Sequence, residues 1–163
     1  MDINELEMNV NCYAQAVYHE VNTRTLEEKV GVINVIRNRL HSGRWGRSVC
    51  AVVYSNNQFA VQDETHHPVN ERAYLETKLL VIDTIVHRKH ANPVANSLYF
   101  HDDSIPPKKE WFGKKKKTHI GRMVFLLMKP LAWLVEEFDS TGKLVWSGLM
   151  TSEPTRTVMV KRP

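Results

Sequence analysis

The chain has 163 residues, of which 42% are hydrophobic, and this is enough for one folded domain with an apolar core. The composition excludes a disordered or fibrous protein. A formal net charge of +4 and an isoelectric point near 9.1 favour a polyanionic partner, such as nucleic acid, a membrane surface or a bacterial envelope. The longest apolar stretch, 123–135, is interrupted by Lys129-Pro130 and is too short to span a bilayer.

The first segment is predicted to be an amphipathic helix, because apolar residues recur at spacings of three and four between Leu6 and Val21. Glu20 lies roughly 60° from the centre of the apolar stripe, at its edge. A carboxylate in such a place can be partly desolvated and act as a general acid. The alternative is an ordinary boundary glutamate that extends into water.

Further helices are indicated by their capping residues. Thr25 and Glu28 form a capping box that predicts the start of a second helix, and Gly43 is its expected stop. Asn70 is predicted to cap a long helix that ends at Asn92-Pro93. The segments 96–101 and 120–128 are short and apolar, and no secondary structure is assigned to them.

The C-terminal region differs in character from the rest. Residues 133–138 and 144–146 flank a turn containing Gly142, which predicts a β hairpin, and 157–161 could add a third strand. We therefore expect an α+β fold that is mainly α. A helical domain over 1–130 would carry a β appendage over 131–163 packed on the same domain.

Several chemistries are excluded by spacing. His19-Glu20 lacks the second histidine of a zinc protease, because position 23 is Thr23. The other histidines, His66, His67 and His101, have no ligand spacing, so neither a metal nor a cofactor is predicted. Two cysteines provide no disulfide framework, and Cys12 and Cys50 are interpreted as small core residues. Carboxylate chemistry is what remains.

A set of short motifs occurs in a fixed order along the chain, at 12–20, 30–39, 48–54, 58–59, 98–101, 111 and 120–125. Taken together, these motifs resemble the SleB-type cell-wall hydrolases, which include spore-cortex-lytic enzymes and phage lysins. The resemblance implies a lysozyme-like fold that cleaves the glycan strand of peptidoglycan at the MurNAc-GlcNAc linkage, with Glu20 as the acid. It also implies that five residues bind the substrate or shape the cleft. The five residues are Gln58, Phe59, Tyr99, His101 and Trp111, and for Phe59 packing in the core is the favoured interpretation.

The chain departs from this family where Arg24 stands in place of a usual second glutamate. Since Glu20 is the one carboxylate that the motifs identify, the sugar's own C6 hydroxyl is the favoured acceptor, and the protein is predicted to be a lytic transglycosylase. Hydrolysis by water remains an alternative if a second carboxylate takes part. The candidates for that role are Glu27, Asp63, Glu64, Asp102 and Asp103.

A run of lysines is predicted to hold the enzyme to anionic envelope polymers. It consists of Lys114, Lys115, Lys116 and Lys117. Rival interpretations are a basic nucleic-acid-binding protein that uses the region 108–117, and an inactive wall-binding module. In the favoured interpretation the partner is peptidoglycan, the protein binds no specific nucleic acid, and it is a monomer. Because the N-terminus shows no signal peptide, we expect synthesis in a host bacterial cytoplasm and action on the wall, as for a phage endolysin or a virion-associated lysin.

Overall fold

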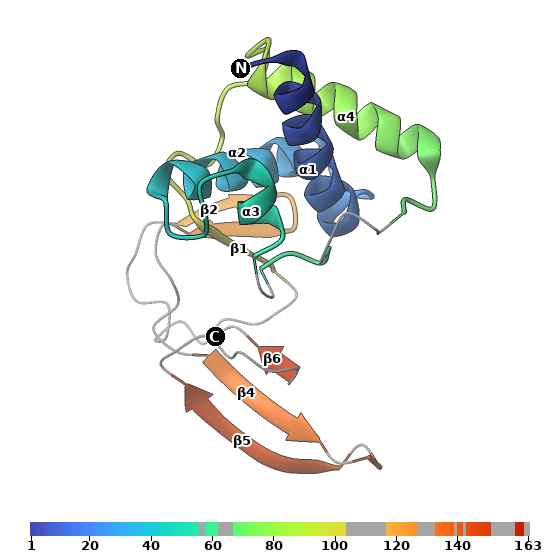
Figure 1. Ribbon diagram of the computed structural model, residues 1–163. Helices are drawn as coiled ribbons and strands as arrows, with labels where there is room; N and C mark the ends of the chain where they lie inside the picture. The colour runs from blue at the N-terminus through green and yellow to red at the C-terminus, as the bar shows by residue number, and fades with distance from the viewer. Residues whose placement is uncertain are drawn as a thin grey trace.

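Helix α1 (Ile3–Val21) contacts α2 (Leu26–Ser42), α3 (Val49–Val53) and α4 (Glu71–Ile85), and the four pack into a helical body (Figure 1). The structure is a computed structural model that describes residues 1–55, 58–61, 67–103, 117–126, 133–138, 140–141, 143–150 and 159–161. Apolar side chains from all four helices share one core. It includes Val17, Ile33, Val52 and Val81, each 0% exposed.

The predicted helix starts are confirmed by their caps. Thr25 Oγ1 accepts a hydrogen bond from the Glu28 amide at 3.2 Å, and Glu28 Oε1 accepts one from the Thr25 amide at 3.2 Å. Asn70 Oδ1 accepts from the Ala73 amide at 3.0 Å and begins α4. Each such cap stabilises its helix by about 0.5–2 kcal/mol. Gly43 ends α2 with a φ of 72°, as expected of a residue in the left-handed region.

The predicted end of the long helix is wrong, because α4 ends at Ile85 and not at Asn92-Pro93. Arg88 adopts a φ of 51°, which turns the chain out of the helix. The Lys89 amide donates to the Asp83 carbonyl oxygen at 2.9 Å and stabilises this turn. The side chains of the same two residues form an ion pair, with Lys89 Nζ 3.0 Å from Asp83 Oδ1. In the part of the chain that the structure describes, no helix has the length and apolar character needed to cross a membrane.

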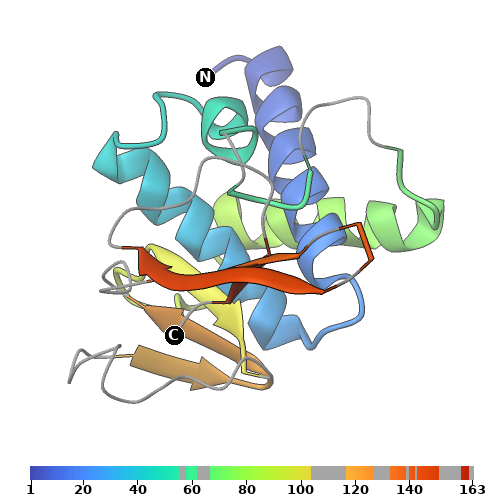
Figure 2. The same ribbon diagram turned by 90° about the horizontal axis from the view of Figure 1, so that it is seen from below.

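The body also contains an antiparallel sheet, to which sequence patterns assigned no strand. It is built from β1 (Tyr99–Asp102), β2 (Lys117–Ile120) and β3 (Met123–Leu126) in the order β1-β3-β2, and it lies beside α2 (Figures 1 and 2). Phe125 on β3 is 0% exposed and packs against α2 at Gly31, where an added Cβ would lie 2.6 Å from the ring. Burial does not alternate along β1 or β3, so an apolar-polar alternation could not identify these strands.

A second antiparallel sheet follows, with the order β5-β4-β6. Its strands are β4 (Trp133–Phe138), β5 (Leu144–Met150) and β6 (Met159–Lys161), and Figure 1 shows β4 and β5 as a long hairpin. The predicted C-terminal strands are thus confirmed, as is the mainly helical α+β class. The domain boundary at residue 130 and the packing of this sheet on the helical domain stay predictions.

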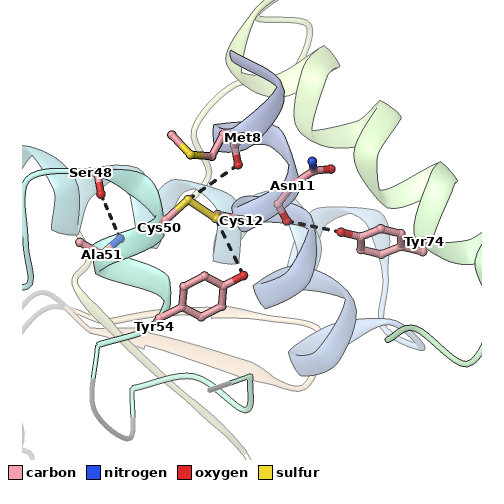
Figure 3. Close-up of a disulfide and its surroundings, with 8 residues drawn as sticks. All are labelled: Met8, Asn11, Cys12, Ser48, Cys50, Ala51, Tyr54 and Tyr74. Carbon is pink, nitrogen blue, oxygen red and sulfur yellow. Dashed lines mark hydrogen bonds between the residues drawn. A yellow bond between two sulfur atoms is a disulfide. The ribbon is translucent and has the colours of Figure 1, made fainter. Parts of the chain in front are cut away.

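The two cysteines lie in the apolar core or pack against it, as interpreted, but they are also bonded to each other, which no sequence pattern predicted. Cys12 on α1 and Cys50 on α3 form a disulfide with an S–S distance of 2.11 Å and a Cα–Cα distance of 5.2 Å (Figure 3). The two residues are 38 positions apart, and only the packing of α3 on α1 brings them together. Neither residue's sequence neighbours could reveal this pairing.

The turn between β2 and β3 generates a prediction about stability. Gly121 has a φ of +57°, and an added Cβ would lie 2.5 Å from Oε1 of Glu28, the carboxylate that caps α2. Gly121→Ala should therefore lower the free energy of unfolding by about 2–4 kcal/mol, through the left-handed backbone and the displaced carboxylate. Gly43→Ala is the matched control, because its φ is +72° and nothing lies within 4 Å of the added atom. We expect a loss of about 1–2 kcal/mol there, measured by chemical denaturation; equal losses would show that the contact with Glu28 is unimportant.

Candidate active site

Glu20 is the penultimate residue of α1 and is partly exposed, as its place at the edge of the apolar stripe predicted. Its Oε1 accepts a hydrogen bond from the backbone amide of Ala60 at 2.5 Å. On the same helical turn, Val17 and Val21 are 0% and 1% exposed, which fixes the rotation of the helix about its axis. The carboxylate is therefore presented at the surface from a rigid support and has a backbone donor that stabilises its ionised form.

The last turns of α1 are joined to two later parts of the chain. Ala60, which bonds Glu20, lies in the segment that follows α3. Tyr18 accepts a hydrogen bond on its hydroxyl oxygen from the Asn70 amide at 2.9 Å, at the start of α4. Both contacts use backbone donors, so the path of the chain after α3 and at the start of α4 helps to set the position of the carboxylate.

Two of the predicted site residues meet at Arg39, which sequence reasoning did not identify as part of the site. Arg39 is 4% exposed, and its Nε donates to the Leu98 carbonyl oxygen at 2.7 Å. Its Nη1 donates to Oε1 of Gln58 at 2.9 Å. The guanidinium carbon lies 4.3 Å from the ring centroid of Trp45 and 5.3 Å from that of Tyr99. A buried cation held by hydrogen bonds and aromatic rings thus orients Gln58 and Tyr99.

Phe59 is placed in the core, where it is 4% exposed and packs near Phe100 at a centroid distance of 6.1 Å. Its neighbours on either side make the bonds just described, Gln58 to Arg39 and Ala60 to Glu20. The buried ring of Phe59 therefore anchors residues 58–60, which are bonded to Arg39 on α2 and to the carboxylate of Glu20. Its predicted contact with substrate stays a prediction.

His101 on β1 is 4% exposed, and its Nδ1 lies 2.8 Å from the carbonyl oxygen of Asp102. Tyr99 shares its face of the strand, because side chains alternate, while Phe100 points to the helical core. Trp111 and the lysines Lys114 to Lys116 lie outside the described residues, and the same holds for the side chain of Lys117.

Arg24, which stands in place of the usual second glutamate of the resembled family, forms an ion pair with Asp102. Arg24 also lies 3.8 Å from Glu28, a 2% exposed carboxylate that the Thr25 cap and the Arg122 amide supply with hydrogen bonds. A buried carboxylate needs such partners. The position thus serves to tie the start of α2 to β1.

Two of the five candidates for a second catalytic carboxylate are paired with basic side chains. Asp102 pairs with Arg24, and Asp103 lies 3.0 Å from His119. Glu27 is exposed and lines a hollow of about 530 Å³ whose other lining residues are Leu26, Val30, Lys89, His90, Ala91 and Pro93. Asp63 and Glu64 lie outside the described residues. Within the described ranges, no three His, Cys, Asp or Glu side chains gather as a group that could hold a metal ion.

Comparison with known proteins gives a family and two solved structures. The model of the Cell Wall Hydrolase family matches residues 24–126, more than half of the chain, and the match begins just after Glu20. The catalytic domain of the germination-specific lytic transglycosylase SleB from Bacillus anthracis is 26% identical, with a TM-score of 0.55 over 72% of this chain and 93% of that one. The catalytic domain of the Bacillus cereus SleB protein is 25% identical, with a TM-score of 0.57 over 74% and 90%. No curated protein sequence matches the chain significantly.

The Arg39 cluster generates a second prediction. Arg39→Lys keeps the charge but loses the planar group that stacks on Trp45 and bonds two acceptors at once. We expect the free energy of unfolding to fall by about 2–3 kcal/mol in urea titrations, because a buried acceptor loses its donor. Arg47→Lys is the control, since Arg47 is exposed and its replacement should change stability by less than about 0.5 kcal/mol. Similar small effects of both replacements would contradict the proposed role of Arg39.

Proposed function

The chain belongs to the cell wall hydrolase family, and we propose that it is a lytic transglycosylase that cleaves the glycan strand of peptidoglycan at the MurNAc-GlcNAc linkage. The observation that carries this proposal is Glu20, a partly exposed carboxylate on a rigid helix with the Ala60 amide as its donor. The likeness to the catalytic domain of a germination-specific lytic transglycosylase supports the same reaction.

The reaction needs one group that first gives and then takes a proton. Protonated Glu20 donates its proton to the bridging oxygen while the bond from that oxygen to C1 of the muramic acid breaks. The oxocarbenium-like C1 is then attacked by the sugar's own C6 hydroxyl oxygen, and ionised Glu20 accepts the proton that this hydroxyl releases. The Ala60 amide stabilises the carboxylate between the two steps. The products are a free hydroxyl end and a 1,6-anhydro end.

The absence of an acid at position 24 supports this single-acid mechanism over hydrolysis. A hydrolase with two carboxylates needs the second one ionised and available on the other side of the sugar. Asp102 is paired with Arg24, and Asp103 lies beside His119 and 3.9 Å from Arg122, so both are engaged with basic groups. Gln58 and Tyr99, held by Arg39, are the groups that we propose to contact the glycan.

The site of action belongs to the same proposal. Peptidoglycan lies outside the cytoplasmic membrane, where thiols oxidise, and the Cys12–Cys50 disulfide agrees with such a compartment. We propose that the protein acts on the wall after release from the cytoplasm, as an endolysin or virion-associated lysin does. Attraction of the lysine run to anionic envelope polymers, with binding that weakens in salt, stays a prediction.

Replacing the acid tests the assignment of Glu20. Glu20→Gln keeps the size and the hydrogen-bonding capacity but cannot donate the proton, so the rate of muropeptide release from purified peptidoglycan should fall by about 100-fold or more. Glu76→Gln is the matched control, because Glu76 is 67% exposed in a surface pair with Arg72 and should keep full activity. A folded Glu20→Gln protein with the rate of the unmodified enzyme would refute the assignment.

Product analysis tests the reaction type. Mass spectrometry of digested peptidoglycan should find muropeptides that end in 1,6-anhydro-muramic acid, because the C6 hydroxyl replaces water as the acceptor. Digestion in ¹⁸O-labelled water should place no label in these ends. Reducing ends that carry ¹⁸O would identify a muramidase instead.

A further inference from the structure

We propose that the Cys12–Cys50 disulfide positions the backbone donor of the catalytic acid, so that full activity requires the oxidised protein. This inference rests on the proposed function of Glu20. The two cysteines do not touch the substrate in this scheme. They act through α3 and the segment after it, and they are therefore positioning residues.

The disulfide fastens a short element to the helix that carries the acid. Helix α3 has five residues, and a helix of this length is unstable by itself. Ser48 caps it by accepting from the Ala51 amide at 3.1 Å. Figure 3 shows the bridge between the two helices, with Tyr54 and Met8 beside it. The Tyr54 hydroxyl oxygen lies 3.9 Å from the Cys12 sulfur, and the Met8 carbonyl oxygen lies 3.8 Å from the Cys50 sulfur.

The segment after α3 leads directly to the acid. The Ser55 amide donates to the Val52 carbonyl oxygen at 3.4 Å, and the Gln58 amide donates to that of Ser55 at 3.3 Å. Ten positions after Cys50, the amide of Ala60 meets Glu20. The disulfide thus holds one end of this segment, while Arg39, bonded to Gln58, holds it near the other.

Loss of the bridge should change the chemical step more than the binding of substrate. Without it, apolar packing of Val49, Val52 and Val53 holds α3 on α1, and such packing is less specific about position than a covalent bond. A displacement of about 1 Å at a catalytic group can lower the rate by about 100-fold. Of the side chains that are proposed to bind the glycan, Tyr99 lies on β1, outside this segment, and Gln58 is bonded to Arg39 on α2. Binding of the glycan should therefore be less affected than the chemical step.

The bridge is open to redox chemistry, because Cys50 is only partly buried. A dithiol reduces it by thiol-disulfide exchange: the reagent gives two electrons and two protons to the two sulfurs and becomes a cyclic disulfide. Removal of the reagent and addition of a disulfide oxidant reverses the reaction. Activity should follow this cycle.

The experiment compares the oxidised protein, the protein reduced under native conditions, and the double variant Cys12→Ser/Cys50→Ser. We expect kcat for muropeptide release to fall by about 10-fold to 100-fold in both bridge-free forms, with KM changed by less than about 2-fold. Reoxidation should restore the reduced protein and leave the double variant unchanged. Unchanged kcat in folded, bridge-free protein would overturn the proposal.

Two further variants separate positioning from stability. Val81→Ala removes buried methyl groups from α4 and lowers stability with the disulfide intact, so kcat should stay at the unmodified value wherever the protein is folded. Ser48→Ala weakens the cap of α3 without touching the bridge, and kcat should fall to an intermediate value even if the double variant does not fold. If Val81→Ala lowers kcat as much as reduction does at equal stability, the bridge has only a structural role.

The Ala60 amide provides a direct readout. Its NMR signal should shift on reduction and in the oxidised Glu20→Gln protein, and it should keep its position in Val81→Ala. An unshifted signal in the reduced protein would overturn the inference. Its failure is distinguishable from that of the proposed function, because an active Glu20→Gln protein refutes the latter, whereas an inactive Glu20→Gln protein with fully active reduced enzyme refutes the inference alone.

Discussion

The burial of α1 among the other three described helices is the constraint on which the site depends. Ala14, Ala16 and Val17 are 0% exposed, and two of these are small enough to let neighbouring helices approach closely. Packing of this kind, more than intrinsic helix propensity, stabilises helices in proteins. Because the apolar stripe allows one rotation of the helix about its axis, the direction of Glu20 follows from residues that have no chemical role themselves.

Around this helix, the site is assembled by polar contacts between segments that are distant in the chain. Arg39 brings together Leu98, Gln58 and two aromatic rings, and the buried Phe59 holds the segment that carries Gln58 and Ala60. The cation is satisfied by protein groups, which makes it a scaffold for Gln58 and Tyr99, the residues proposed to contact the glycan. The bridge from α1 to α3 adds a covalent restraint at the opposite end of the same segment.

The family relationship that the ordered motifs indicate is confirmed by the family match over 24–126 and by two SleB catalytic domains. The departure at Arg24 has a physical explanation. A base there pairs with Asp102 on β1 and lies near the carboxylate that caps α2. The position therefore contributes to the joint between the helices and the sheet, and Glu20 stays the proposed catalytic carboxylate.

The sequence by itself determined the features that depend on contacts within a few residues. Helix periodicity placed Glu20 at the edge of a core-facing stripe, and caps at Thr25 and Asn70 marked two helix starts, because these bonds join residues three apart. Only the tertiary structure decided the three-stranded sheet and the early end of α4. The same is true of the disulfide and of the bond from Arg39 to Leu98, whose partners lie 38 and 59 residues apart. Such contacts depend on how the whole chain packs, and sequence patterns that span only a few residues cannot predict them.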